Sequence, residues 1–191
     1  MAADPKDAKI YVLPSILVGF VALGFAFAAF ESLSPPEGYL GVILALLLGL
    51  ASIIDARHFI LPDVITLPLT VMGLGIAAIF GGLTIFESAI GAVAGYTSFW
   101  LIASLYKRRR GIDGLGLGDA KLMAAAGAWC GVLLLPFVVL VGSVSALVWV
   151  AIAALYTRQL KATSAIPFGP FLSLGFITIW LAHQRDWIPI P

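Results

Sequence analysis

Long uncharged runs are the feature that most constrains how this 191-residue chain can fold. A helix needs about 20 apolar residues to cross the hydrocarbon core of a bilayer. Six long runs without Asp, Glu, Lys or Arg reach or approach that length: 10–30, 38–54, 64–86, 88–106, 122–157 and 162–182. Since 61% of the residues are hydrophobic and only 11% are charged, the chain cannot present the charged surface of a soluble domain. The sequence therefore predicts an all-α fold, a polytopic transmembrane helix bundle.

The run 122–157 is too long for one crossing. Its 36 residues would extend roughly 54 Å as a single helix, against a hydrocarbon core of about 30 Å. We expect the run to fold back around residues 127–131, Gly-Ala-Trp-Cys-Gly. This gives seven spans in a single domain, residues 1–191, with the fifth span beginning at Asp119. The alternative is six spans, with the run crossing once.

The basic residues predict the orientation of these spans. Cytoplasmic loops carry an excess of Lys and Arg, and a cytoplasmic N-terminus with seven spans leaves only Arg185 outside. Ten basic residues then lie inside: Lys6, Lys9, Arg57, Lys107, Arg108, Arg109, Arg110, Lys121, Arg158 and Lys161. The outer loops hold Glu31, Glu37 and Glu87. In this arrangement Asp55 ends the second span and Asp119 starts the fifth, both at the cytoplasmic face.

Composition also limits the partners and cofactors. A net charge of +1 argues against a nucleic-acid partner, and Arg108–Arg110 is better explained as a topology anchor than as a lipid or RNA patch. The single cysteine, Cys130, excludes an internal disulfide framework and a thiolate zinc site. His58 and His183 suggest no metal site, so we expect no metal and no cofactor. We expect residues 10–30 to be retained as the first span and not removed as a signal peptide, because Asp4 and Asp7 precede them.

Asp55 and Asp119 are the candidate catalytic residues. An ionisable side chain costs roughly 2.5 to 3.5 kcal/mol at the middle of a membrane, and less near its edge, so such a residue is a candidate for function. Two neighbouring carboxyl groups cannot both ionise easily, and sharing one proton makes one of them a base and the other an acid. Such a pair hydrolyses a peptide bond without a metal or a covalent intermediate.

Helix ends predict which carboxyl group holds the shared proton. Asp55 comes at the carboxyl end of a helix, where the macrodipole disfavours negative charge. Asp119 comes at an amino end, where free N–H groups favour it. We therefore expect the proton on Asp55 in the absence of substrate.

Other residues near the two aspartates have both an ordinary and a functional interpretation. Gly116 and Gly118 make either a simple loop-to-helix junction or a surface that an extended substrate approaches closely. Asp63 follows Pro62 in an arrangement typical of a helix start. Three residues, Pro167, Gly169 and Pro170, break regular helix either as an ordinary helix start or as an element that lines the active site.

Two motifs in order carry a family resemblance. The strings Asp55-x₅-Leu61-Pro62-Asp63 and Gly116-x-Gly118-Asp119-x-Lys121-Leu122, followed by Pro167-Phe168-Gly169-Pro170, resemble the bacterial type IV prepilin leader peptidases, aspartic membrane proteases of the Gly-x-Gly-Asp class. The similarity covers about residues 38–182.

The resemblance implies a specific reaction. Members of the family remove the basic leader of prepilins and pseudopilins at the cytoplasmic face of the inner membrane, just after a glycine and before the hydrophobic pilin helix. It assigns catalysis to Asp55 and Asp119 and makes Asp63 and Lys121 motif positions. For Lys121 two interpretations stay open: snorkelling to lipid headgroups, or electrostatic support of Asp119 or of an acidic substrate residue.

One departure concerns methylation. Longer members carry paired Cys-x-x-Cys motifs in a cytoplasmic domain between the first two spans and are associated with N-methylation of the mature pilin. Here that connection is only residues 31–37. We therefore expect a peptidase without methyltransferase activity.

The alternatives differ in class or in substrate. Asp55 and Asp119 are also suited to a small cation- or proton-coupled transporter, although a transporter site is expected near the bilayer midplane. A non-catalytic membrane scaffold is a further alternative, but it explains neither motif. A preflagellin peptidase would use the same chemistry as a prepilin peptidase and would differ only in its substrate.

Overall fold

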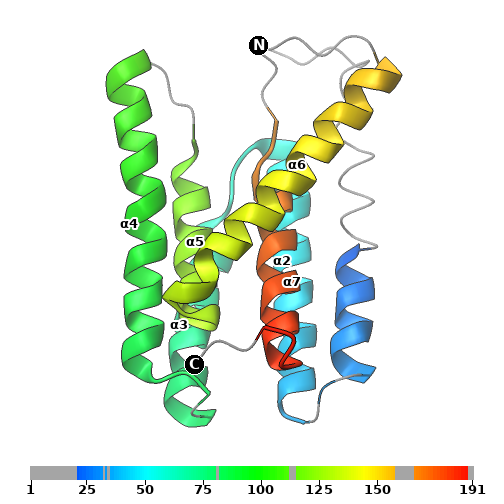
Figure 1. Cartoon of the computed structure of the whole chain (residues 1–191), viewed down its shortest axis with the longest axis vertical. Coiled ribbons are helices and arrows are strands. Elements are labelled where there is room, and N and C mark those ends of the chain that lie inside the picture. Colours follow the sequence, from blue (N-terminus) through cyan, green and yellow to red (C-terminus); the bar gives the residue numbers. More distant parts are fainter. Residues whose placement is uncertain are drawn as a thin grey trace.

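The fold is a bundle of α-helices in a computed structural model, which describes residues 21–31, 33, 35–80, 82–111, 115–157 and 166–188. In these ranges no β-strand occurs. A helix at Val21–Glu31 is followed by seven elements, of which Figure 1 labels the α-helices: α2 (Glu37–His58), α3 (Asp63–Phe80), α4 (Ile85–Arg110), α5 (Leu117–Cys130), the 3₁₀ turn η1 (Val132–Leu134), α6 (Leu135–Thr157) and α7 (Gly169–Gln184). The prediction of an all-α bundle is confirmed.

The long run folds back at the predicted place. α5 ends at Cys130, and Gly131 follows with a φ of 75°, in the left-handed region that favours glycine. The chain then reverses through η1 into α6. The described residues thus contain seven α-helices, as expected for the seven-segment arrangement.

Not all of these helices are long enough to cross a bilayer on their own. By length and composition, four qualify within the described ranges: α2, α3, α4 and Val132–Leu155. α5 has 14 residues and α7 has 16, which corresponds to about 21 and 24 Å of helix. Both short helices begin beside the candidate site, where the chain enters the bundle.

The boundary between α3 and α4 differs from the prediction. Uncharged runs predicted a helix through residue 86, with Glu87 in an outer loop, but α3 ends at Phe80 and α4 begins at Ile85. Thr84 and Glu87 form a reciprocal capping box, with Thr84 N–H donating to Glu87 Oε2 at 2.8 Å and Glu87 N–H donating to Thr84 Oγ1 at 3.2 Å. Glu87 therefore belongs to the first turn of α4, because its carboxylate satisfies a free backbone N–H.

One end of the bundle collects the predicted functional segments. Figure 1 shows the ends of α2 and α4 and the beginnings of α3, α5 and α7 at the same end. Asp55 lies in the last turn of α2, and Asp119 is the third residue of α5. Arg108–Arg110, in the last turn of α4, lie at this end too. Lys6, Lys9, Arg158 and Lys161, on which the orientation also depends, are outside the described residues.

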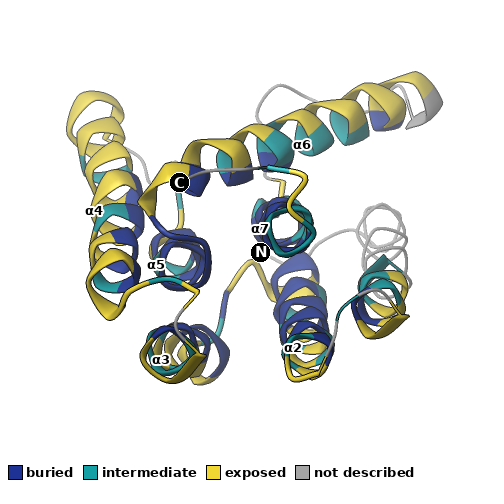
Figure 2. Cartoon of the chain, turned by 60° about the horizontal axis from the view of Figure 1, so that its bottom comes forward, coloured by how far each residue is buried: buried dark blue, intermediate teal, exposed yellow. Residues whose placement is uncertain are grey.

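α5 is the most enclosed helix, and small residues let its neighbours approach. From Asp119 to Cys130 all but two of its residues are buried, and Figure 2 shows exposed faces on α3, α4 and α6 around it. Gly91 of α4 lies against Gly127 of α5 so closely that a Cβ at either position would overlap the other residue's backbone. Helices in membranes associate through such small residues because lipid offers no hydrophobic driving force between them.

Polar contacts fix the depth of α5 in the bundle. Trp129 Nε1–H donates to the Leu69 carbonyl of α3 at 2.8 Å, and Ser88 Oγ–H donates to the Ala128 carbonyl at 2.6 Å. The Trp129 ring also meets Phe176 and Trp180 of α7 edge to face. These contacts hold α5 against α3, α4 and α7.

We predict that Gly91→Ala destabilises the protein by about 1 to 3 kcal/mol, because the added methyl group must separate α4 from α5. Gly75→Ala is the matched control, since a Cβ there meets no atom within 4 Å. The measurement is thermal unfolding of both variants in detergent. Equal unfolding temperatures would show that the contact between the glycines is not tight.

Candidate active site

Asp55 is a buried carboxylate held by another helix. Its side chain is 6% exposed, and its Oδ2 accepts a hydrogen bond of 3.0 Å from the backbone N–H of Gly169, the first residue of α7. The residues are 114 positions apart. The first N–H groups of a helix have no partner inside the helix, so the start of α7 provides a donor that the carboxylate uses.

The chain turns sharply after Asp55. Phe59 has a φ of 56° and donates its N–H to the Asp55 carbonyl at 2.8 Å, which ends α2. A non-glycine residue in this region is uncommon. After the turn, Leu61 lies against Gly118 of α5, and α3 begins at Asp63.

Asp119 lies near the amino end of its helix, whereas Asp55 lies near the carboxyl end of α2. It is 8% exposed, and its N–H donates to the Gly116 carbonyl at 3.1 Å in the first turn of α5. Gly118 lies against Leu61, where a Cβ would come within 2.8 Å of the Leu61 Cβ. Close packing against Leu61 thus requires a residue without a side chain at position 118. The sequence did not indicate this contact, because Leu61 is distant in sequence. Gly116 has an ordinary extended conformation.

Both carboxylates line one cavity of about 420 Å³. The cavity wall combines the turn after α2, the start of α5 and the segment before α7, including Leu61, Gly116, Gly118, Pro167 and Phe168. The structure thus brings together the two aspartates that the sequence singled out, with a space beside them.

The Pro-rich segment before α7 is part of this wall. Pro167 lines the cavity, while Gly169 starts α7 and Pro170 is its second residue. A Cβ at residue 169 would lie 2.6 Å from Asp55 Oδ2. The segment is a helix start that also borders the Asp55 carboxylate, and its role in an active site stays a prediction. The Gly169 N–H could not be identified from sequence, since every non-proline residue carries one.

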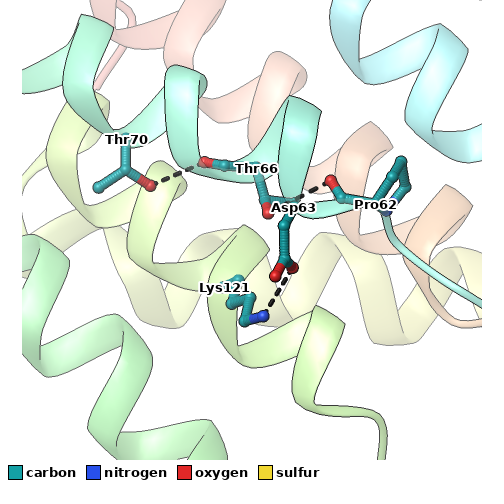
Figure 3. Close-up of polar contacts among 5 residues, drawn as sticks. All are labelled: Pro62, Asp63, Thr66, Thr70 and Lys121. Carbon is teal, nitrogen blue, oxygen red and sulfur yellow. Dashed lines mark hydrogen bonds and ion pairs between the residues drawn. The ribbon is translucent and has the colours of Figure 1, made fainter.

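Asp63 and Lys121 pair with each other. Lys121 Nζ lies 2.6 Å from Asp63 Oδ1, and the two side chains are 30% and 56% exposed respectively. Figure 3 shows this ion pair between the starts of α3 and α5, beside the Thr66 hydroxyl that donates to the Pro62 carbonyl at 3.5 Å. The sequence analysis considered neither residue as the partner of the other. Both also line the cavity.

Two opposing effects act on the protonation of Asp55. The end of α2 favours protonated Asp55, but the N–H of Gly169 favours its ionised form. The second effect depends on a tertiary contact, and it opposes the sequence argument. The placement of the proton on Asp55 stays a prediction.

The sequence profile of the type IV leader peptidase family matches residues 42–151, which is more than half of the chain. The matched range contains Asp55, Asp63, Asp119 and Lys121. No solved structure matches the chain at a significant level.

Among the described residues, no group of three or more His, Cys, Asp or Glu side chains gathers where a metal ion could bind.

Curated relatives cover nearly all of this chain. It is 39% identical over 187 residues to "Prepilin leader peptidase/N-methyltransferase" of Pseudomonas aeruginosa, covering 96% of this chain and 61% of that protein. The protein of the same name from Neisseria gonorrhoeae is 42% identical over 148 residues, 77% of this chain and 50% of the relative. The one from Escherichia coli is 37% identical over 163 residues, 85% and 70% respectively. The chain therefore spans between half and about two thirds of these relatives.

We predict that the ion pair contributes little to stability. Exposed pairs contribute about 0 to 1 kcal/mol, so Lys121→Met and Asp63→Asn should each leave the free energy of unfolding nearly unchanged. Chemical unfolding of the purified variants in mixed micelles measures this. A loss above about 2 kcal/mol in either variant would contradict the assignment as an exposed pair.

Proposed function

The chain belongs to the type IV leader peptidase family, and from this premise we propose that it is an aspartic endopeptidase that removes the basic leader of prepilins or pseudopilins. The observation that carries the proposal is the single cavity lined by the buried carboxylates of Asp55 and Asp119. A transporter would need its cation site near the bilayer midplane, whereas both residues lie near helix ends at one end of the bundle.

The proposed reaction uses one water molecule and one shared proton. The ionised carboxylate takes a proton from water while the oxygen of that water attacks the carbonyl carbon of the scissile peptide. The protonated carboxyl group donates its proton to the carbonyl oxygen, which gives a neutral tetrahedral intermediate. When the C–N bond breaks, the leaving nitrogen takes the proton of the carboxyl group that received it from water, and the other carboxylate takes a proton from one hydroxyl group of the intermediate as the new carboxylic acid forms. The two carboxyl groups then again share one proton.

The surroundings support this chemistry. The Gly169 N–H fixes one oxygen of Asp55, so the carboxyl group keeps its orientation before substrate arrives. Gly116 and Gly118 leave the approach to Asp119 without side chains. The ion pair of Asp63 and Lys121 links the starts of α3 and α5 and supports the position of Asp119 two residues away.

The proposed location is the bacterial inner membrane, with the cavity on the cytoplasmic side and membrane lipid around the bundle. Support comes from the basic residues Lys107–Arg110, which end α4 at the same end of the bundle as the cavity. The proposal includes cleavage but not N-methylation, because the resemblance ties methylation to paired Cys-x-x-Cys motifs and this sequence has one cysteine.

We predict that Asp55→Asn and Asp119→Asn each lower kcat for a prepilin-like peptide by about 10² to 10⁴-fold, since either change removes the acid or the base. Asp186→Asn is the control, because this exposed residue has a left-handed φ of 54° that Asn tolerates. The assay follows peptide cleavage by purified protein in detergent, with unfolding temperatures measured in parallel. Unchanged cleavage in either catalytic variant would refute the role of the pair.

We predict that Gly169→Ala lowers kcat by about 10²-fold while the protein still folds, because the added methyl group displaces the Asp55 carboxylate. Gly75→Ala again serves as the control for a glycine in open space. Steady-state kinetics with the same peptide measure the effect. A Gly169→Ala enzyme with parental kcat would mean that this contact does not position Asp55.

A further inference from the structure

The end of the bundle that holds the catalytic carboxylates is rich in exposed basic residues. Arg57 lies in the last turn of α2, and Lys107–Arg110 form the last turn of α4. Within the described part of the chain, Asp63, the first residue of α3, is the one exposed carboxylate at this end. A positively charged peptide is therefore repelled by most of this end and attracted by Asp63.

The other described carboxylates are either buried or distant from this end. Asp55 and Asp119 are buried. The remaining acidic residues belong to helix ends at the opposite end of the bundle (Figure 1): Glu31, Glu37, Glu87 and Asp186. An exposed anion close to the catalytic pair is thus a particular feature of position 63.

Asp63 also lines the catalytic cavity, whose wall has more negative than positive groups. The ionisable residues among its described lining are Asp55, Asp63, Asp119 and Lys121. When the catalytic pair shares one proton it keeps one negative charge, while the charges of Asp63 and Lys121 cancel. The wall then has one negative charge in excess, which favours a cationic group in the cavity over an anionic one.

Lys121 occupies only part of the Asp63 carboxylate. Its Nζ lies 2.6 Å from Oδ1 (Figure 3), and within the described residues the Asp63 side chain makes no other hydrogen bond or ion pair. The two oxygens of a carboxylate offer about four lone-pair sites, so sites remain for a second cation. Asp63 is also the more exposed partner, at 56% against 30% for Lys121, so the carboxylate is open to an incoming group.

We propose that the Asp63 carboxylate binds a Lys or Arg side chain of the substrate's leader while the scissile bond lies between Asp55 and Asp119. Asp63 is then a specificity-determining residue that takes no part in bond breaking, and Lys121 holds it in the cavity wall. The proposal rests on the proposed function. The reverse assignment, in which Lys121 binds an acidic substrate residue, would require that residue to displace Asp63 from an ion pair of 2.6 Å.

The test compares two synthetic peptides that share a glycine at the cut and an apolar segment after it. The basic peptide has Lys residues in its leader, and the neutral peptide has Gln at the same positions. The variants are Asp63→Asn, Asp63→Glu and Lys121→Met, with Asp186→Asn as the control for an exposed carboxylate at the other end of the bundle. The readout is the selectivity, which is kcat/KM for the basic peptide divided by kcat/KM for the neutral peptide. A change in the position of Asp119 acts on both peptides alike and leaves the selectivity unchanged.

We expect Asp63→Asn to lower the selectivity about fivefold and Asp63→Glu to retain it, because the charge is kept. Lys121→Met should raise the selectivity about twofold, since it removes a neighbouring positive charge. Asp186→Asn should have the parental value. Raising the ionic strength should lower the selectivity of the parent enzyme and have less effect on Asp63→Asn, because salt screens exposed charges.

The two halves of the ion pair thus give opposite predictions, and this separates recognition from a structural role. If Asp63→Asn and Lys121→Met lower the selectivity alike, the intact pair matters and the proposal is wrong. Unchanged selectivity in Asp63→Asn would equally overturn it.

Binding gives a readout that does not depend on cleavage. Fluorescently labelled peptides whose scissile nitrogen is methylated, to prevent cleavage, are titrated with each enzyme in detergent, and anisotropy gives Kd. Asp63→Asn should weaken binding of the basic peptide about fivefold and leave that of the neutral peptide unchanged. If the parent enzyme cleaves neither unmethylated peptide, the proposed function fails, and the Kd values still decide whether Asp63 binds the basic segment. Equal Kd values for the basic peptide in the parent and in Asp63→Asn would refute that binding.

Discussion

The burial of α5 among α3, α4 and α7 is the constraint on which the rest of the structure depends. Gly91 and Gly127 let α4 and α5 approach until their backbones touch, and the Trp129 indole fixes the depth of α5 through the Leu69 carbonyl. With α5 fixed in this way, Asp119 has one position relative to α2 and α7. A carboxylate on a loosely packed helix would not meet its partner reproducibly, because catalytic groups need a geometry held to fractions of an ångström.

Around α5, different interactions serve stability and chemistry. The tight contact between Gly91 and Gly127 and the Trp129 cluster lie near the end of α5, whereas the carboxylates, the Gly169 N–H and the ion pair of Asp63 and Lys121 lie near its beginning. The exposed ion pair contributes little to the free energy of unfolding, so its position at the cavity points to a local role. This separation lets the site keep buried carboxylates, which are costly, while packing elsewhere holds the bundle together.

The site lies where two environments meet. Its cavity adjoins the polar end of the bundle, with Lys121 and Asp63 in its wall, and a second cavity with an apolar lining begins about one turn deeper along α2 and α7. A substrate with a basic leader and an apolar segment has the same order of properties along its chain. Under the proposed function, a scissile bond at the border of the two segments reaches the carboxylates at the end of α2 without burying the leader.

The sequence by itself determined the helical class, the fold-back of residues 122–157 and the two aspartates at helix ends, because membrane spans must be apolar and each charge within them is conspicuous. It misplaced the start of α4, since Glu87 belongs to a capping box that a count of charges does not reveal. Only the tertiary structure decided that Gly169 donates to Asp55, that Gly118 lies against Leu61, and that Asp63 pairs with Lys121. These contacts join residues 57 to 114 positions apart, and helix periodicity and end signals carry no information about which helices become neighbours.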